Sequence, residues 1–260
     1  MIRKILRYFR NKPGKTSQYE TKILKSLLPR SHYAYCCLNA AKQASRLGLK
    51  KISVIEFGCA GGAGLIDLEN ICSEITRLTN VNFEIYGFDS GKGLPKPQDY
   101  RDLPYHWREG FFKMNQNALE TRLTKAKIIY GDVKNTVKKF FEEYKPATIG
   151  CVFHDLDYYS STKASFQIFE RNEKFFLPRS FHYFDDIIGD DIVLYTNYTG
   201  ERLAIKEFNE KFKNKKFDKC YHLITNIEAK TWYFQIRILH LFDHEKYCHF
   251  ISTEDQQIPI

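Results

Sequence analysis

The sequence lacks a long apolar run, which argues against a membrane-spanning helix. No stretch reaches the roughly 18 consecutive apolar residues that indicate such a helix. The first ten residues, MIRKILRYFR, also lack the apolar core of a secretory signal. We therefore expect a cytoplasmic protein.

Paired cysteines are lacking as well. The chain has 7 Cys, an odd number, and no two of them form a C-x-x-C pair. Neither a disulfide framework nor a zinc site is predicted from this pattern. We expect the reduced, buried thiols of a cytosolic protein.

Outside the N-terminus, the sequence has little excess positive charge. Residues 1–30 hold nine Lys and Arg and one acid, Glu20, and so carry +8 of the net charge of +9. The remainder has 31 bases (40 minus 9) against 30 acids (31 minus 1), or +1. Because a nucleic-acid enzyme usually has basic charge clustered across its cleft, we expect no nucleic-acid partner.

The basic N-terminal arm, residues 1–30, is predicted to precede one main domain, residues 31–260. The first nine residues place apolar side chains at helical spacing between basic ones, which is typical of a short amphipathic helix. Packing of this helix on the body or on a partner subunit is the favoured interpretation. Peripheral contact of residues 1–12 with the inner face of an anionic membrane is the alternative.

Strand and helix patterns alternate through the main domain. They predict a first helix over 31–47 and, after a glycine-rich turn, a second helix that ends near 78. Strands are predicted over 51–57, 83–89, 126–132, 147–155 and 180–186, and further helices over 133–144, 161–175 and 202–212. Two late strands, over 217–224 and 231–241, are predicted with no helix between them. Alternation of this kind predicts an α/β fold: a Rossmann-like, doubly wound, mostly parallel sheet. The late pair predicts a C-terminal antiparallel hairpin at one edge.

A glycine-rich turn follows the first predicted strand and indicates a ligand site. Its spacing, G-x-x-G-G-x-G over 58–64, differs from the G-x-G-x-x-G of dinucleotide sites, and Gly58 and Gly62 are expected to lie against the ligand. Glu56 is unusual in an otherwise apolar strand, and a buried carboxylate there needs a partner such as a ligand ammonium group. A tight turn without a ligand is the alternative interpretation.

Acids at the ends of the next two strands strengthen this prediction. Asp89, with Ser90 beside it, ends the second strand and could accept both hydroxyls of a ribose. Asp132 ends the third strand and could accept a hydrogen bond from an adenine amino group. Either acid could instead cap the following helix.

Four more carboxylates lie at the ends of the fourth and fifth strands. Asp155 and Asp157 follow one strand, and Asp185 and Asp186 end the other. Since both ends border the same cleft, these acids would repel one another unless they are protonated or bind a cation. Oxygen ligands indicate Mg²⁺, or else Mn²⁺ or Ca²⁺, on Asp155, Asp185 and Asp186.

Asp157 is then the candidate general base for deprotonating a substrate hydroxyl. His154 and Tyr158 are weaker candidates, and a histidine on a strand is more often part of the core. The alternative is that Asp157 or Ser161 caps the next helix.

The motifs together resemble a known family. GFDSGKGLPKP (87–97), YGDVKNTV (130–137), DLDYYSST (155–162), YFDD (183–186) and GERLAIKEF (200–208) are similar to segments of the macrocin O-methyltransferase family. The resemblance covers about residues 50–240. It departs from the family's pattern at Gly91-Lys92, near the cofactor, and at Pro178-Arg179-Ser180, before the fifth strand.

This resemblance implies a class I methyltransferase domain that uses S-adenosylmethionine and Mg²⁺. It implies metal ligands at Asp155, Asp185 and Asp186, a base at Asp157, transfer to a hydroxyl of a sugar or glycoside, and frequent homo-oligomers. We expect a small-molecule or glycan acceptor, either a secondary metabolite or a surface polysaccharide.

Three alternatives stay open. A catechol-type phenolic O-methyltransferase uses the same metal chemistry, but usually with a lysine base, whereas Asp or Tyr stands at the base position here. A nucleic-acid methyltransferase is motivated by the net charge of +9. A non-enzymatic module recruited through its basic arm belongs to a different class.

Overall fold

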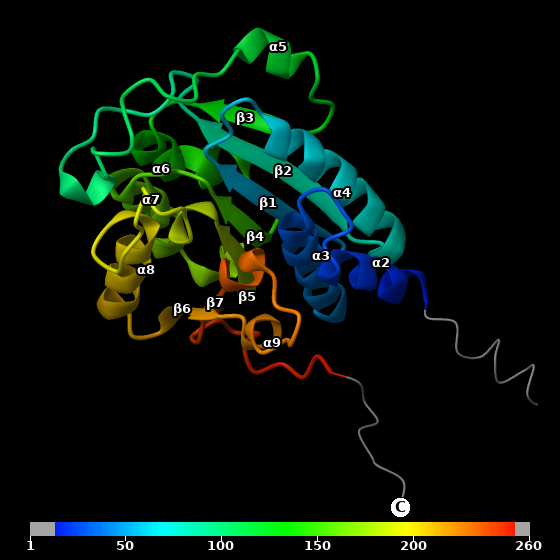
Figure 1. The fold of residues 1–260 in the computed structure, drawn as a ribbon. Coiled ribbons are helices and arrows are strands. Elements are labelled where there is room, and N and C mark those ends of the chain that lie inside the picture. The colour runs from blue at the N-terminus through cyan, green and yellow to red at the C-terminus, as the bar shows by residue number, and fades with distance from the viewer. Residues whose placement is uncertain (1–13, 253–260) are drawn as a thin grey trace, which may run out of the picture.

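Seven strands form one mixed sheet in the order β3-β2-β1-β4-β5-β7-β6 (Figure 1). The computed structural model describes residues 14–252. The strands are β1 (Lys51–Phe57), β2 (Asn82–Asp89), β3 (Lys127–Tyr130), β4 (Ile149–His154), β5 (Phe176–Phe184), β6 (Lys215–Lys219) and β7 (Ile236–Leu241). Strands β1 to β5 pair in parallel, and β7 is antiparallel to both β5 and β6. The α/β class and the antiparallel C-terminal edge are confirmed.

The two central strands explain why the sheet needs helices on both faces. β4 is buried along its whole length, and β1 is buried at every residue after Lys51. Parallel strands of this kind are apolar on both sides because crossover helices cover both faces of the sheet.

Two groups of helices provide that cover (Figure 1). One core cluster joins the sheet to α3 (Ser31–Arg46) and α4 (Ala63–Thr79), with α2 (Lys15–Leu24) packed outside them. The other joins the sheet to α6 (Val133–Tyr144), α7 (Tyr159–Ser165) and α8 (Gly200–Lys211). The loop after β2 holds the 3-10 turn η1 (Tyr100–Asp102) and the short helix α5 (Gln116–Glu120).

The predicted helix over 161–175 is wrong in its extent. α7 ends at Ser165, and the chain continues as 3-10 turns η2 (Phe166–Glu170) and η3 (Glu173–Phe175). β5 consequently begins at Phe176, before the predicted residue 180. Phe166, Ile168 and Phe169 all pack into the second core cluster, and 3-10 geometry places Phe166 and Phe169, three residues apart, on the same side of the turn.

The late strands are shorter than predicted, and the expectation that no helix separates them is wrong. α9 (Tyr221–Ile224) and the 3-10 turn η5 (Thr231–Phe234) lie between β6 and β7. Leu223, Trp232 and Tyr233 bury their side chains in the core cluster on the α3 side. This connection therefore serves as a further layer over the sheet rather than as a tight turn.

Only part of the predicted basic arm lies within the described residues. Ile23 of α2 is fully buried, and Glu20 forms an ion pair with Lys42 of α3. The predicted amphipathic helix and the membrane contact of residues 1–12 lie outside the described residues and stay predictions. Within residues 14–252, no helix combines the length and apolarity that crossing a membrane requires.

Candidate functional site

The glycine-rich turn brings the ends of β1 and β4 into direct contact. Gly58 has φ +81°, and a Cβ there would lie 1.7 Å from the carbonyl oxygen of Asp155. Gly62 has φ +78°, and a Cβ there would lie 2.1 Å from the side chain of Leu119 on α5. Both positions require glycine because a side chain would be strained and would clash. Contact of either residue with a ligand stays a prediction.

Asp89 holds this turn through its carboxylate. One oxygen accepts hydrogen bonds from the backbone N–H groups of Cys59 (2.8 Å) and Ala60 (3.0 Å), and the other accepts from Gly91 (2.7 Å). The neighbouring Ser90 hydroxyl accepts from the Lys92 N–H and donates to the Gly93 carbonyl. The structure therefore gives both residues a role in shaping the loop, and their contact with a ribose stays a prediction.

Asp132 is exposed and caps α6. Its carboxylate accepts a hydrogen bond of 2.9 Å from the backbone N–H of Lys134. This is the helix-cap alternative that the sequence left open, and contact with an adenine is untested.

Glu56 is a buried carboxylate that lies beneath the turn. Its Oε1 accepts a hydrogen bond of 2.8 Å from the hydroxyl of Tyr33, while Oε2 has no hydrogen-bond partner among the described residues. Burial raises the pKa of Glu56 to about 7, although the Tyr33 hydrogen bond and the charge of Arg30 lower it. A Cβ at Gly64 would lie 1.8 Å from Oε1, so glycine is needed there to admit the carboxylate.

The predicted acidic cluster forms at the carboxyl ends of β4 and β5. Asp155, Asp185 and Asp186 each place one carboxylate oxygen within 4.8 Å of the others. Burial, followed by the charges of the neighbouring acids, raises the pKa of Asp155 well above its usual range. Burial and Asp185 raise the pKa of Asp186 to about 6, against hydrogen bonds from Tyr195 and from the backbone of Asp157.

Surrounding residues hold these acids in fixed orientations. The hydroxyl of Tyr183 donates to Asp185, and the hydroxyl of Tyr195 donates to Asp186 at 2.7 Å. The backbone N–H of Asp186 donates to Glu201, a carboxylate of α8 that is fully buried. The cluster is therefore built into the fold rather than spread over a flexible surface.

Asp157 lies beside the cluster in a strained backbone conformation. Its φ of +58° is in the left-handed region, which is uncommon for residues other than glycine. Its backbone N–H donates to Asp186 at 2.8 Å, and burial, together with Asp186 and Asp185, raises its pKa to about 9. The N-cap of α7 is Tyr158, without a side-chain cap, so the helix-cap alternative for Asp157 and Ser161 is wrong.

His154 is part of the core. Its Nε2 lies 3.1 Å from Nδ1 of His182, and its ring stacks on Phe184 at 4.2 Å between centroids. Tyr158 is also fully buried, and its hydroxyl has no partner within residues 14–252. His154 thus has the core placement that is usual for a strand histidine.

Several residues at the site were missed from the sequence. The start of α3 brings Arg30, His32 and Tyr33 to the same edge, where His32 stacks on Tyr183 at 4.2 Å and Tyr33 bonds Glu56. No local pattern marks them, because their partners lie far along the chain. Glu201 had a signal, since it is an acid in the first turn of a helix within one of the family-like segments.

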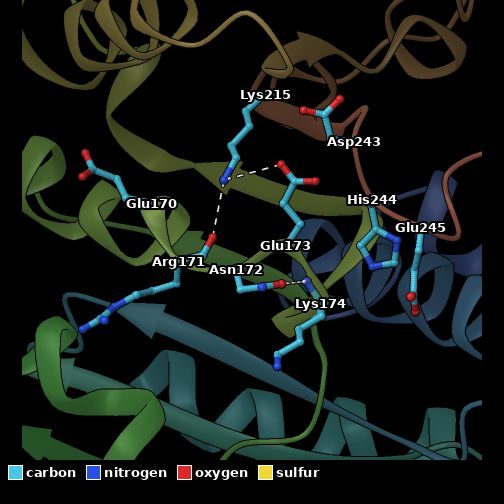
Figure 2. A pocket seen from close by; sticks show the side chains of 9 residues that line it. All are labelled: Glu170, Arg171, Asn172, Glu173, Lys174, Lys215, Asp243, His244 and Glu245. Carbon is cyan, nitrogen blue, oxygen red and sulfur yellow. Dashed lines mark hydrogen bonds and ion pairs between the residues drawn. The ribbon is translucent and has the colours of Figure 1, made fainter.

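A hollow of about 690 Å³ in the described surface lies away from this site (Figure 2). It opens next to the amino end of β5, opposite the end that carries Asp185 and Asp186. Lys215 lies between Glu173 and the carbonyl of Arg171, so charges of both signs are already paired there (Figure 2). This hollow lacks the converging acids of the candidate site.

Comparison with known proteins matches the fold. No protein-family model and no curated protein sequence matches the chain. The calicheamicin methyltransferase CalS11 has a similar structure, with a TM-score of 0.56 and 18% identity, over 93% of this chain and 91% of that one. The O-methyltransferase NovP follows with a TM-score of 0.54 and 13% identity, over 81% and 79%. The chain therefore has the Rossmann-like fold of these methyltransferases.

Proposed function

We propose that this protein is an S-adenosylmethionine-dependent O-methyltransferase that acts on a hydroxyl of a sugar or glycoside with the help of Mg²⁺. The observation that carries the proposal is the cluster of Asp155, Asp185 and Asp186 at the same sheet edge as the glycine-rich turn. In open α/β sheets, ligands bind at this carboxyl edge.

The residues of the cluster suit a divalent cation. Three carboxylates converge, and burial, followed by their mutual repulsion, raises the pKa of Asp155 and of Asp186, so a cation would relieve an electrostatic cost. Oxygen ligands of this kind favour Mg²⁺ over softer metals. A bound ion would orient an acceptor hydroxyl and lower its pKa.

The chain's own part in the reaction is to move a proton and to hold the acceptor. Asp157 is buried beside the cluster, and a cation held there would lower its raised pKa, so that its carboxylate would take the proton of the acceptor hydroxyl as the oxygen is methylated. Tyr195 and Glu201 fix Asp186, which in turn fixes the backbone of Asp157. Such fixed geometry favours catalysis because little reorganisation is needed during the reaction.

The similar structures support the reaction class. One is named a calicheamicin methyltransferase and the other an O-methyltransferase. We propose a sugar acceptor because the segments at 155–162 and 183–186 resemble those of the macrocin O-methyltransferase family. We propose that Glu56, Asp89 and Asp132 contact the cofactor. The acceptor is proposed to be a small molecule or glycan, with homo-oligomer formation as an accompanying expectation.

An acceptor screen that measures S-adenosylhomocysteine production with and without Mg²⁺ tests the proposal. Sugar nucleotides, glycosides and catechol would be compared, since catechol turnover would favour the phenolic alternative. Asp155→Ala should abolish methyl transfer while cofactor binding, measured by calorimetry, is retained. Asp218→Asn, on the exposed face of β6, is the matched control. Full activity in excess EDTA would contradict the role of the metal.

A further inference from the structure

We propose that two loops at the carboxyl edge of the sheet dock this protein on the surface of a lipid bilayer that contains anionic lipids. The loops are residues 92–113, after β2, and residues 188–198, before α8 (Figure 1). We call them the docking loops. The proposal concerns binding alone, so it stands or falls separately from the proposed reaction.

Exposed apolar side chains gather on the docking loops. Of the 14 large hydrophobic side chains that are exposed in the described part of the chain, 8 lie there. The two loops are in contact, since the hydroxyl of Tyr105 donates to the carbonyl of Val193 at 2.6 Å. Single exposed apolar residues are ordinary, but a group of them on adjoining loops indicates a binding surface. The eight are Tyr100, Tyr105, Phe111, Phe112, Ile188, Ile192, Leu194 and Tyr198.

The tip of the first docking loop holds two exposed phenylalanines at a conformational cost. Phe111 and Phe112 are 42% and 49% exposed, and Phe112 has φ +60°, in the left-handed region that a bulky residue rarely adopts. Backbone hydrogen bonds of 2.8 Å brace this turn, from the N–H of Leu94 to the carbonyl of Phe111 and from the N–H of Gly110 to the carbonyl of Leu94. The fold therefore keeps an aromatic ring in a position that is both strained and exposed, which points to binding rather than packing.

Basic side chains beside the tip favour an anionic bilayer. Four exposed bases of the first docking loop form no ion pair with any described residue: Lys92, Lys96, Arg108 and Lys113. Among the acids of this loop, Glu109 is exposed, Asp102 is buried, and Asp99 forms an ion pair with Arg101. Aromatic rings surrounded by long basic side chains are typical of the zone between lipid headgroups and hydrocarbon, where the rings insert and the bases reach the phosphates.

The second docking loop favours a bilayer over a nucleic acid. Ile188, Ile192 and Leu194 are aliphatic, so they cannot stack on bases, whereas they can enter the boundary of the acyl chains. Asp190 and Asp191 are exposed on the same loop and would be repelled by the phosphates of either partner. Apolar contact should therefore supply most of the binding, and anionic lipid a smaller part.

Flotation of the full-length protein with vesicles tests the inference. The wild type should float with vesicles of equimolar phosphatidylcholine and phosphatidylglycerol, and more weakly with phosphatidylcholine alone. Phe111→Ser combined with Phe112→Ser should weaken binding to the mixed vesicles by at least about tenfold, because two rings lose their burial in the bilayer. Arg108→Gln combined with Lys113→Gln should weaken it by about tenfold, and only where phosphatidylglycerol is present.

A matched control replaces two exposed phenylalanines outside the docking loops. Phe234→Ser combined with Phe250→Ser should float like the wild type. Every variant keeps the predicted basic helix of residues 1–12, so a loss of flotation reports on the docking loops. Melting followed by circular dichroism shows that each variant is folded.

The inference is overturned if the wild type does not float, or if both loop variants float as well as the wild type does. It is also overturned if the phenylalanine substitutions convert a dimer into a monomer, or abolish binding to single-stranded RNA, while flotation is unchanged. A raised KM for a soluble acceptor with unchanged flotation would assign the two rings to the acceptor and not to a bilayer.

Discussion

Two buried acidic sites, Glu69 and the cluster of Asp155, Asp185 and Asp186, have surroundings that shift carboxyl pKa values in opposite directions. Glu69, on α4, accepts hydrogen bonds from four donors: the backbone N–H groups of residues 124–126 and the hydroxyl of Thr124. Burial alone would raise its pKa, but these hydrogen bonds, led by that from Thr124, lower it below the usual range. In the cluster, burial and neighbouring charges both raise the pKa of Asp155.

The difference separates an acid whose charge is stabilised by the fold from acids whose charges the fold leaves uncompensated. Glu69 stabilises the folded protein most when it is ionised, since its hydrogen-bond donors favour the charged form. The clustered acids are ionised at a cost, and that cost is relieved only by protons or by a cation. Asp89 and Glu69 resemble each other in this respect, because both bind backbone N–H groups of loops near the site.

The largest effect that would sharpen this comparison is expected at Asp155. Asp155→Asn should lower methyl-transfer activity by at least about 100-fold, since a bound divalent ion supplies several kcal/mol of stabilisation. The same substitution should raise the free energy of unfolding of the metal-free protein, because it removes a carboxyl group whose charged form is destabilised by burial and by the neighbouring acids. Mg²⁺ should raise the melting temperature of the wild type but not of the variant. Loss of stability in Asp155→Asn would show that the cluster is not strained.

The pH dependence of Glu56 comes next in size. Because its folded pKa of about 7 exceeds the ordinary 4.5, the folded protein holds a proton that the unfolded chain releases. The free energy of unfolding should therefore fall as pH rises from 4.5 through about 7, by about 3 kcal/mol in total. Glu56→Gln should lose less stability than the wild type across this window by urea denaturation without ligand, because Asp155, Asp157 and Asp186 still titrate in both proteins while the contribution of Glu56 is gone. Parallel curves for the two proteins would refute the assignment.

Glu69 should respond with the opposite sign to Asp155. Glu69→Gln removes the charge that four donors favour, and should lower the free energy of unfolding by about 2 kcal/mol at neutral pH. Activity per folded molecule should change little, since Glu69 lies outside the acidic cluster. Glu74→Gln, an exposed position on the same helix, serves as the control for urea denaturation. If Glu69→Gln were neutral, the contrast between the two sites would be lost.

The convergence of the acids was predictable because it follows from topology. Parallel neighbours β4 and β5 end at the same edge, so the acids after each strand had to approach one another. The partners of those acids were not predictable in the same way. Tyr33 reaches Glu56 across 23 positions, and a contact of that kind leaves no periodic or local pattern.

Short-range features left two interpretations open where one residue type can serve two physical roles. Asp132 could cap a helix or bind a ligand, and the cap is what the structure shows. The segment after α7 had helical periodicity, yet it forms 3-10 turns because its rings pack more closely on the sheet. Tertiary packing decided the second case, and it cannot be read from spacing alone.

The smallest expected effect concerns a third buried acid, Asp102, which ties the loop after β2 to α7. Its carboxylate is fully buried and accepts hydrogen bonds from the backbone and hydroxyl of Ser160 and from the backbone of Gln98. Ser160→Ala removes the hydroxyl and should cost about 1 kcal/mol of local stability. Amide exchange should then accelerate in residues 98–103 and not in β1 or β4, with Ser161→Ala as the neighbouring control. Equal exchange rates in Ser160→Ala and Ser161→Ala would mean that Asp102 holds the loop through backbone donors alone. Asp102 would then resemble Glu69, whose carboxylate is held mainly by backbone N–H groups, more than the acids of the cluster.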